Sequence, residues 1–372
     1  MPFTVSTVTT PEANGVMRAR KMFYANGLFW IFYSNGTNGV WRTSSDGETW
    51  SSESIWRGGT PTGVAFSIHY DGAFIHYVWA AGTTPLYRRG LLNSDGSITW
   101  SAVEQNTDGG IAGWYPTITV DSSGQPWIGF SGEVAGVKYP YVSMSTATDG
   151  TWTTGAGFPY QLSAAITGDH TFSIPVALSG GNVYAVYGTH STTVRGQLYD
   201  VTTGWGAEEV ASTSNTQISN CNAVADSNDN IHVIFEKLSA AVTYTVTVVS
   251  RESGVWGAET ALSSTRTYII LSKIAVDTDT NALYAFWADS GSIYMQIRDA
   301  NGSWSGVITV LSGEGTWKYS GGLMSIFDCS YQKYERSIML TWMNGTASPY
   351  SLRFDTLSLL ESSVKTAPNF GL

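Results

Sequence analysis

The chain has 372 residues, of which 13% are charged, 13% are aromatic and 40 are glycine, and its formal net charge at pH 7 is −10. Nucleic acids and anionic membranes require a basic footprint, which 19 Lys and Arg against 29 Asp and Glu do not supply. We therefore exclude nucleic acid as a general partner, and the same charge counts against a strongly polyanionic substrate. The sequence has no run of about twenty apolar residues, so no membrane insertion is expected.

Tryptophan recurs along the chain at intervals of 48 to 53 residues and defines a repeat. The six members are Trp50, Trp100, Trp152, Trp205, Trp256 and Trp304. A repeat of this length through nearly all of the chain predicts one closed assembly, with residues 1–372 as a single domain.

Each repeat predicts four short strands, a to d from the centre outward, joined by glycine-rich turns. The b strands are the clearest, as short aromatic or β-branched runs, and they span Leu28–Tyr33, Phe74–Trp79, Trp127–Phe130, Val183–Tyr187, Ile231–Phe235, Leu283–Trp287 and Ile338–Trp342. Seven such runs without helical periodicity predict an all-β, seven-bladed β-propeller of four-stranded antiparallel blades.

The seventh repeat has no tryptophan hairpin, and its outer strand is expected to come from the start of the chain. Residues Phe3 to Val8 alternate like a strand and precede the first complete repeat. Pairing of this segment beside Leu352 to Phe354 would close the ring and leave only short strand edges exposed.

Turn residues precede the repeating tryptophans, as in Ser44 to Trp50 and Asn93 to Trp100. An Asp-Gly pair suits a tight hairpin, because Gly adopts positive φ and Asp bonds its own turn. These copies resemble the Asp-box, or BNR repeat, of sialidase-like β-propellers. They are c–d turns, which lie on the face opposite the b–c and d–a connections. Their carboxylates are therefore predicted to be scaffold, and function is expected on the opposite face.

In the fourth repeat, Asp169-His170 opens strand a and His190 ends strand b. The stretch Phe172 to Pro175 resembles the Phe-Arg-Ile-Pro motif of sialidases, but Ser173 replaces the arginine that would hold a substrate carboxylate. The substitution predicts that the protein is not a sialidase.

The arrangement of Asp169-His170, then Pro175, then Tyr187 to His190 is similar to the one in propeller polysaccharide lyases of the ulvan-lyase type. The resemblance implies that His170 and His190 are the base and the neutralising group, that Arg251 faces the uronate and that Tyr244 is the acid. β-Elimination requires a base near the proton and a cation or donor on the carboxylate, which these residues would supply. The alternative left open is that both histidines are hydrogen-bonded rim residues.

Aromatic residues at strand ends and at d–a connections are candidates for stacking on the apolar face of a sugar ring. With Arg195, which follows His190, the predicted substrate-binding residues are Trp79, Trp114, Tyr115, Tyr268 and Tyr319.

Two a–b turns, residues 226–230 and 277–281, carry alternating oxygen ligands that could hold Ca²⁺. Each lacks the downstream acidic ligand of a complete EF-hand loop, and Asx-turn chemistry explains both turns without an ion. We predict no cofactor and no metal, with Ca²⁺ as the open alternative.

The N-terminus shows no basic segment followed by an apolar core, so no secretory signal is expected in it. Three hypotheses remain for the function. The first is an extracellular or virion-surface glycan-recognising propeller, lectin-like or receptor-binding, with carbohydrate as its partner and assembly into a larger surface or virion structure. The second is a polysaccharide lyase acting on uronate-containing polysaccharide, and the third is a purely structural surface protein.

Overall fold

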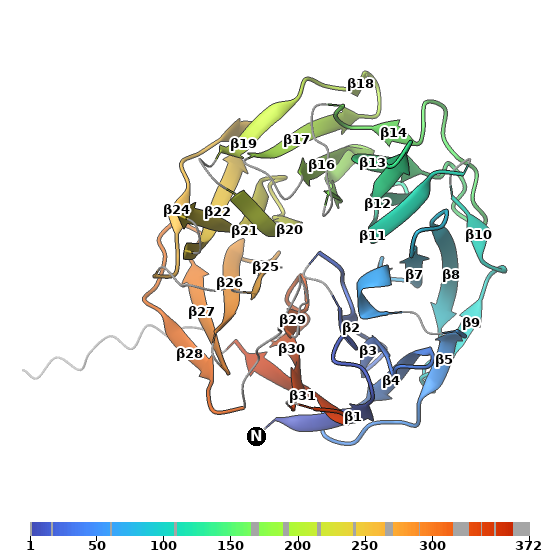
Figure 1. Ribbon diagram of the computed structural model, residues 1–372, viewed down its shortest axis with the longest axis vertical. Coiled ribbons are helices and arrows are strands. Elements are labelled where there is room, and N and C mark those ends of the chain that lie inside the picture. Colours follow the sequence, from blue (N-terminus) through green and yellow to red (C-terminus); the bar gives the residue numbers. More distant parts are fainter. Residues whose placement is uncertain are drawn as a thin grey trace, which may run out of the picture.

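The computed structural model describes residues 2–15, 18–59, 62–107, 110–164, 171–188, 193–213, 217–240, 243–264, 271–289, 291–314, 327–335, 337–345 and 347–359. Seven antiparallel sheets surround a central axis, as Figure 1 shows, and confirm the predicted seven-bladed, all-β architecture. Helical structure in these ranges is confined to two 3₁₀ turns, η1 (Gly63–Ala65) and η2 (Ser179–Gly181). Within the same ranges no helix is long and apolar enough to cross a membrane.

Each of the first three blades runs outward from an inner strand. Blade 1 contains β2 (Met22–Ala25), β3 (Leu28–Ser34), β4 (Gly39–Ser44) and β5 (Ser54–Arg57). Blade 2 contains β6 (Phe66–Tyr70), β7 (Phe74–Trp79), β8 (Leu86–Leu92), β9 (Ile98–Trp100) and β10 (Gln105–Asn106). Blade 3 contains β11 (Ala112–Val120), β12 (Pro126–Val134), β13 (Val137–Met144) and β14 (Tyr160–Gln161).

The next three blades follow the same plan. Blade 4 contains β15 (Phe172–Ala177), β16 (Val183–Gly188), β17 (Thr193–Asp200), β18 (Gly204–Trp205) and β19 (Glu209–Thr213). Blade 5 contains β20 (Gln217–Ala225), β21 (Ile231–Ala240), β22 (Thr243–Glu252), β23 (Val255–Trp256) and β24 (Thr260–Ala261). Blade 6 contains β25 (Leu271–Asp277), β26 (Ala282–Asp289), β27 (Ser292–Arg298) and β28 (Ile308–Leu311).

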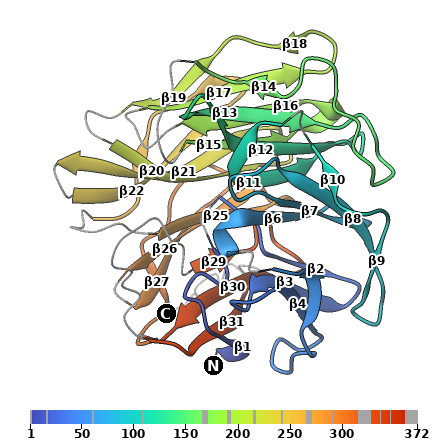
Figure 2. The ribbon, with the colours of Figure 1, turned by 45° about the vertical axis from the view of Figure 1, so that its right-hand side comes forward.

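Blade 7 is built from both ends of the described chain. It contains β29 (Phe327–Cys329), β30 (Ser337–Asn344), β31 (Tyr350–Ser358) and β1 (Phe3–Val8). Strand β1 pairs antiparallel with β31, with Phe3 opposite Phe354 and Ser6 opposite Leu352, and Figure 2 shows the two strands side by side. The predicted closure and its predicted partner strand are thus both present.

The order of strands gives the ring two faces. We call the face with the a–b and c–d turns the turn face, and the face with the b–c and d–a connections the connector face. On the turn face the hairpin carboxylates bond their own turns: Asp46 Oδ1 accepts from the amides of Glu48 and Thr49 at 2.8 Å each, and Asp149 Oδ1 accepts from the amide of Thr151 at 2.9 Å. These contacts account for the carboxylates as turn-forming groups.

The apolar core lies between neighbouring blades, where the b strands stack. One cluster joins blades 6, 7 and 1, and another joins blades 3 and 4. The repeating tryptophans are only partly buried. Trp50 packs edge-on against Phe354 of blade 7 at 5.0 Å, and Trp152 packs against Tyr87 of blade 2 at 5.1 Å. They therefore link each hairpin to the preceding blade.

The connection from β1 to β2 enters the ring of inner strands, where Figure 1 draws it in dark blue. We call its described residues 13–15 and 18–21 the axial segment. The carbonyl oxygens of Ala13 and Arg20 accept from backbone amides of blades 1 and 2, at 2.8 and 2.9 Å. The carbonyl oxygen of Ala19 accepts from Lys273 Nζ of blade 6 at 3.1 Å. The axial segment thereby connects blades 1, 2 and 6 at the centre of the ring.

Buried charge surrounds this segment. Lys273 Nζ lies 2.7 Å from Asp328 Oδ1, and both side chains are 2% exposed. Lys21 Nζ donates to the carbonyl oxygens of Gly63 and Phe66, and burial holds its pKa well below the ordinary value. Because an unpaired buried charge is costly, these contacts fix blades 1, 2, 6 and 7 around the axis.

Within the axial segment, Arg20 Nη1 donates to Nδ1 of His69 at 2.8 Å, and the Arg20 guanidinium carbon lies 4.1 Å from the ring centre of Tyr331. An imidazole that accepts this hydrogen bond is neutral. Burial first, and then the positive charge of Arg20, hold the pKa of His69 well below its ordinary value. The pKa of nearby Asp71 is lowered to about 2, because hydrogen bonds from His76 and the turn amides outweigh the effect of burial.

We expect the protein to lose stability as the pH falls from about 6.5 to about 5. The unfolded chain protonates His69 near its ordinary pKa of about 6.5, whereas the folded chain keeps it neutral, so each pH unit costs up to about 1.4 kcal/mol. Burial also lowers the pKa of His76, which acts in the same direction. Urea-unfolding midpoints across this range measure the slope. His69→Gln keeps an acceptor for Arg20 and should give a shallower slope; equal slopes would contradict the assignment.

Candidate functional site

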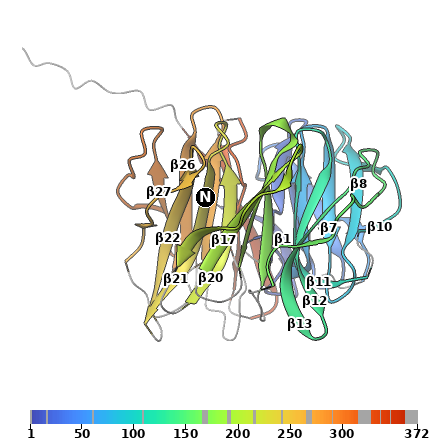
Figure 3. The same cartoon turned by 90° about the horizontal axis from the view of Figure 1, so that it is seen from above.

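Two hairpins project from the connector face. Strands β12 and β13 of blade 3 and strands β21 and β22 of blade 5 are 8 to 10 residues long, whereas β16 of blade 4 has 6. Figure 3 shows both hairpins extending beyond the ring on the same side. Blade 4 lies between them in the ring, so its inner strand ends between two projections.

The inner strand of blade 3 is distorted near the connector face. The pairing of β11 with β12 shifts register between Trp114 and Thr117. Within this irregularity Tyr115 has φ 52°, the only positive φ of a non-glycine residue inside a described strand. Such a conformation costs about 1–3 kcal/mol and is found where a bulge re-aims a side chain. Beside it, Lys138 Nζ of β13 lies 4.7 Å from the ring centre of Trp114.

The axial segment brings Arg18 to this region. Its guanidinium carbon lies 4.8 Å from the ring centre of Phe172, at the start of β15, and 5.6 Å from that of Tyr115. Arg18 is 6% exposed, and burial lowers the pKa of its guanidinium, which nearby Cys221, Tyr115 and Glu236 partly offset. Arg18 Nε has no hydrogen-bond partner among the described residues.

Blade 5 contributes an acidic and a phenolic group. Glu236 of β21 is fully buried, and its Oε1 accepts from Ser272 Oγ at 3.1 Å. Tyr244 of β22 lies opposite Leu238, two residues from Glu236, and its pKa is raised by burial and by the negative charge of Glu236. The axial segment thus supplies a cation to this region, and blades 3 to 5 supply two aromatic rings, a carboxylate and a phenol. Such groups can bind a polar ring by stacking and hydrogen bonding.

Several predicted residues lie elsewhere. Arg251 is at the turn-face end of β22, where Nε and Nη2 donate to Glu209 at 2.7 and 2.8 Å. Seven residues along the strand place it about 23 Å from Tyr244, so the two do not share a site. Arg195, near the connector face, forms an ion pair with Glu208. His170, His190, Tyr268 and Tyr319 lie outside the described residues.

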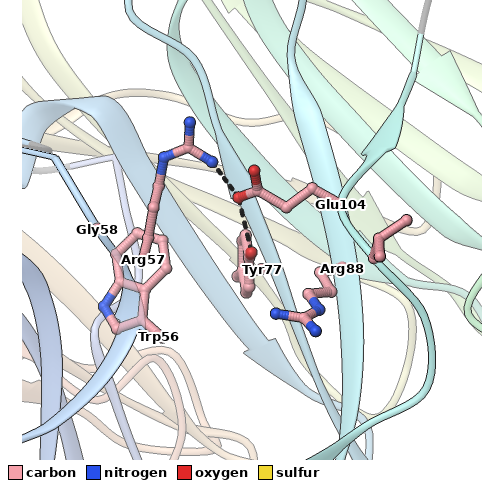
Figure 4. Close-up of a pocket in the computed structure, with 7 residues that line it drawn as sticks. Trp56, Arg57, Gly58, Tyr77, Arg88 and Glu104 are labelled. Atoms are coloured by element: carbon pink, nitrogen blue, oxygen red, sulfur yellow. Dashed lines mark hydrogen bonds and ion pairs between the residues drawn. The ribbon is translucent and has the colours of Figure 1, made fainter.

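Trp79 belongs to a different environment from Trp114 and Tyr115. The guanidinium carbon of Arg57 lies 3.9 Å from its ring centre, on the outer side of blades 1 and 2. Arg57 also pairs with Glu104, which accepts from Tyr77 Oη at 2.7 Å, and Figure 4 shows this arrangement. Arg57, Tyr77 and Glu104 line an open cavity of about 480 Å³ with Trp56 and Arg88.

This cavity is explained by a repeated link between blades. A glutamate stands three or four residues after each of three repeating tryptophans. It accepts a hydrogen bond from a side chain 47 positions earlier, on the preceding blade. The pairs are Ser6–Glu53, Arg57–Glu104 and Ser212–Glu259. Because the link recurs around the ring, the cavity at Glu104 is assigned to the scaffold.

The two acidic a–b turns are occupied by protein groups. Lys333 Nζ lies 2.6 Å from Asp277 Oδ1 and 2.9 Å from Asp279 Oδ2. Asp226 accepts from the amides of Asn228 and Asn230, at 2.9 and 3.0 Å. No cluster of three His, Cys, Asp or Glu side chains that could hold a metal occurs in the described ranges. The absence of a cofactor remains a prediction.

Sequence reasoning did not identify Arg18 or Glu236. The available signal was Arg18, Arg20 and Lys21, three basic residues within four positions of a chain that has only 19. Their partners come from distant blades, and the spacing of the sequence gives no indication of them.

No protein-family model and no curated protein match the sequence. Solved structures match it in fold. A PL25 ulvan lyase aligns with TM-score 0.63 and 11% identity over 95% of this chain and 96% of its own. The polysaccharide lyase Uly1 aligns with TM-score 0.55 and 9% identity over 92% and 90%, and AofleA from Arthrobotrys oligospora with 0.53 and 14% over 81% and 88%.

The chain shares its propeller fold with these proteins. At such low identity the likeness shows the architecture alone, because a fold of this kind carries many unrelated functions. The fold expected from the sequence resemblances is therefore confirmed. The Asp-box repeat, the histidine roles and the cellular location stay predictions.

Proposed function

We propose that the protein recognises a glycan on its connector face without cleaving it, as a lectin-like or receptor-binding component of an extracellular or virion surface. The observation that carries the proposal is the bulge in β11, where Tyr115, next to Trp114 in the chain, lies with its ring 5.6 Å from Arg18 of the axial segment. Aromatic faces with a few polar groups are the usual components of sugar-binding sites. The full-length likeness in fold to an ulvan lyase whose structure contains bound -[GlcA(1-4)Rha3S]- supports a carbohydrate-related role.

Sialidase activity is not proposed. The position that would carry the sialidase arginine is Ser173, which is fully buried in β15 and whose carbonyl oxygen accepts from Thr117 Oγ1 at 2.7 Å. A residue so enclosed by two inner strands supplies no cation to a substrate.

A glycan array tests the proposal, followed by titration of the ligands that bind. Trp114→Ala should weaken binding about tenfold, which corresponds to the loss of about 1.4 kcal/mol of stacking. Trp152→Ala, which removes a partly buried tryptophan from the turn face of the same blade, serves as the matched control and should bind normally. Equal loss in both variants would indicate general destabilisation, and absence of binding to any glycan would refute the proposal.

The second candidate is β-elimination of a uronate polysaccharide, which the position of Tyr244 at the connector-face end of β22 favours. A phenol on this face can transfer a proton to or from a bound sugar. Absorbance of unsaturated uronate products, measured on a panel of uronate polysaccharides, tests this activity. An eliminase signal in the wild type that is lost in Tyr244→Phe would replace the non-catalytic proposal.

A further inference from the structure

The basic side chains near the axis differ in what they bond. Lys21 donates to two backbone carbonyls, Lys273 pairs with Asp328, and Arg20 donates to His69. Arg18 is 94% buried and donates no hydrogen bond to any described residue. Its guanidinium instead lies against the aromatic rings of Phe172 and Tyr115. An aromatic face attracts a cation but leaves the planar N–H donors of a guanidinium unsatisfied.

From this difference we propose that Arg18 is the anion-binding residue of the connector face and holds a carboxylate or sulfate group of an acidic glycan. The inference rests on the proposed glycan-binding function and specifies its ligand. A guanidinium matches both groups because its N–H pairs bind two oxygens in one plane, and such charge-assisted bonds are strong where water is excluded.

The carboxylate of Glu236 does not take this role. Glu236 influences Arg18 electrostatically, but no ion pair forms between them, and its Oε1 is engaged by Ser272. A buried cation without a bonded counter-charge costs several kcal/mol, so an entering anion would supply a partner that the described residues do not provide.

The strained backbone at Tyr115 is an independent indication. A regular strand would point alternate side chains to opposite faces of the sheet, whereas the bulge with φ 52° brings the Tyr115 ring to within 5.6 Å of Arg18. Strain of this kind is retained at functional sites where it orients a group. With Phe172 on β15, the ring limits the directions from which a ligand group could reach the guanidinium.

The net charge of −10 bears on how an acidic ligand would be recognised. Long-range attraction of a polyanion is not expected from such a chain, so recognition should depend on one buried contact and not on a basic surface. Binding should accordingly distinguish acidic from neutral sugars of the same shape while falling only modestly as salt is added.

Arg18→Met provides the decisive variant, because it keeps an unbranched, flexible side chain that can pack between the rings and removes the unpaired charge. A purely structural arginine would destabilise the fold when replaced, whereas an anion-binding one should leave the melting temperature unchanged or higher. The probes are glucuronate, glucose 6-sulfate and, as the neutral reference, glucose. Glucuronate or glucose 6-sulfate should raise the melting temperature of the wild type, whereas glucose should not. The probe that gives the larger rise shows whether Arg18 prefers a carboxylate or a sulfate.

With Arg18→Met the anion-dependent shift should disappear. Arg298→Met on the turn face, where Arg298 pairs with Glu252 at 2.7 Å, should keep it. Among glycans that bind in the array, carboxyl reduction or desulfation should weaken wild-type binding at least tenfold. Equal binding of acidic and modified glycans would overturn the Arg18 assignment alone. If the array binds nothing, the proposed function fails and the inference with it.

Discussion

Asp328→Asn is expected to lower the free energy of unfolding by about 3–5 kcal/mol, because it leaves a buried ammonium group without its counter-charge. The Asp328 carboxylate lies 2.7 Å from Lys273 Nζ and, with both side chains 2% exposed, it is shielded from water. Its charge also acts on Lys21, which has only backbone carbonyls as hydrogen-bond partners among the described residues. Chemical denaturation of the two proteins side by side measures the loss.

Glu252→Gln is the matched control. It breaks the ion pair with Arg298, but Glu252 is 45% exposed, and exposed pairs contribute about 1 kcal/mol or less. Replacing both Lys273 and Asp328 by apolar residues should cost less than Asp328→Asn, since the Lys273 ammonium group is then no longer left without its counter-charge. If Asp328→Asn loses no more stability than Glu252→Gln, the axial ion pair does not hold the ring.

Trp127→Ala is expected to cost about 3–5 kcal/mol, the range found when a fully buried aromatic side chain is removed. Trp127 is completely buried between blades 3 and 4, with ring centres of Tyr199 and Phe158 at 5.0 and 5.3 Å. Its indole Nε1 also donates to Asp121 Oδ2 at 2.9 Å, which would lose its partner. Urea-unfolding midpoints give the comparison with wild type.

The same substitution at Trp50 separates the effect of burial from that of residue type. Trp50 is partly exposed and packs against the edge of Phe354, so Trp50→Ala should cost less, about 1–3 kcal/mol. A loss at Trp50 as large as that at Trp127 would show that the hairpin tryptophans, and not the b strands, dominate the stability of the blades.

The architecture was predictable because each blade repeats the same local pattern. The b strand that contains Trp127 follows from a short aromatic run after a turn, and closure by Phe3 to Val8 follows from a seventh repeat that lacks its outer strand. Local rules of this kind require only the period and the alternation of side chains.

The site was less predictable. Which residues belong to it depends on the face of the ring at which each strand position lies and on contacts between segments that meet at the axis. Arg251 and Tyr244 lie on one strand and were assigned to one site, yet they stand near opposite ends of the ten-residue β22, and Glu209 binds the arginine. Arg18 meets Tyr115 and Phe172 across about a hundred residues or more of sequence. No spacing rule connects residues that converge only when the ring has closed.

The pairing of β1 with β31 has a consequence for the order of folding. During synthesis β1 is made about 350 residues before its partner Phe354, so β1 must wait unpaired until β31 is available. The same holds for Asn14, whose Nδ2 donates to Thr341 Oγ1 at 3.5 Å. Contacts this distant in sequence slow folding. Ring closure and seating of the axial segment therefore form the last step, and the candidate site is assembled only then.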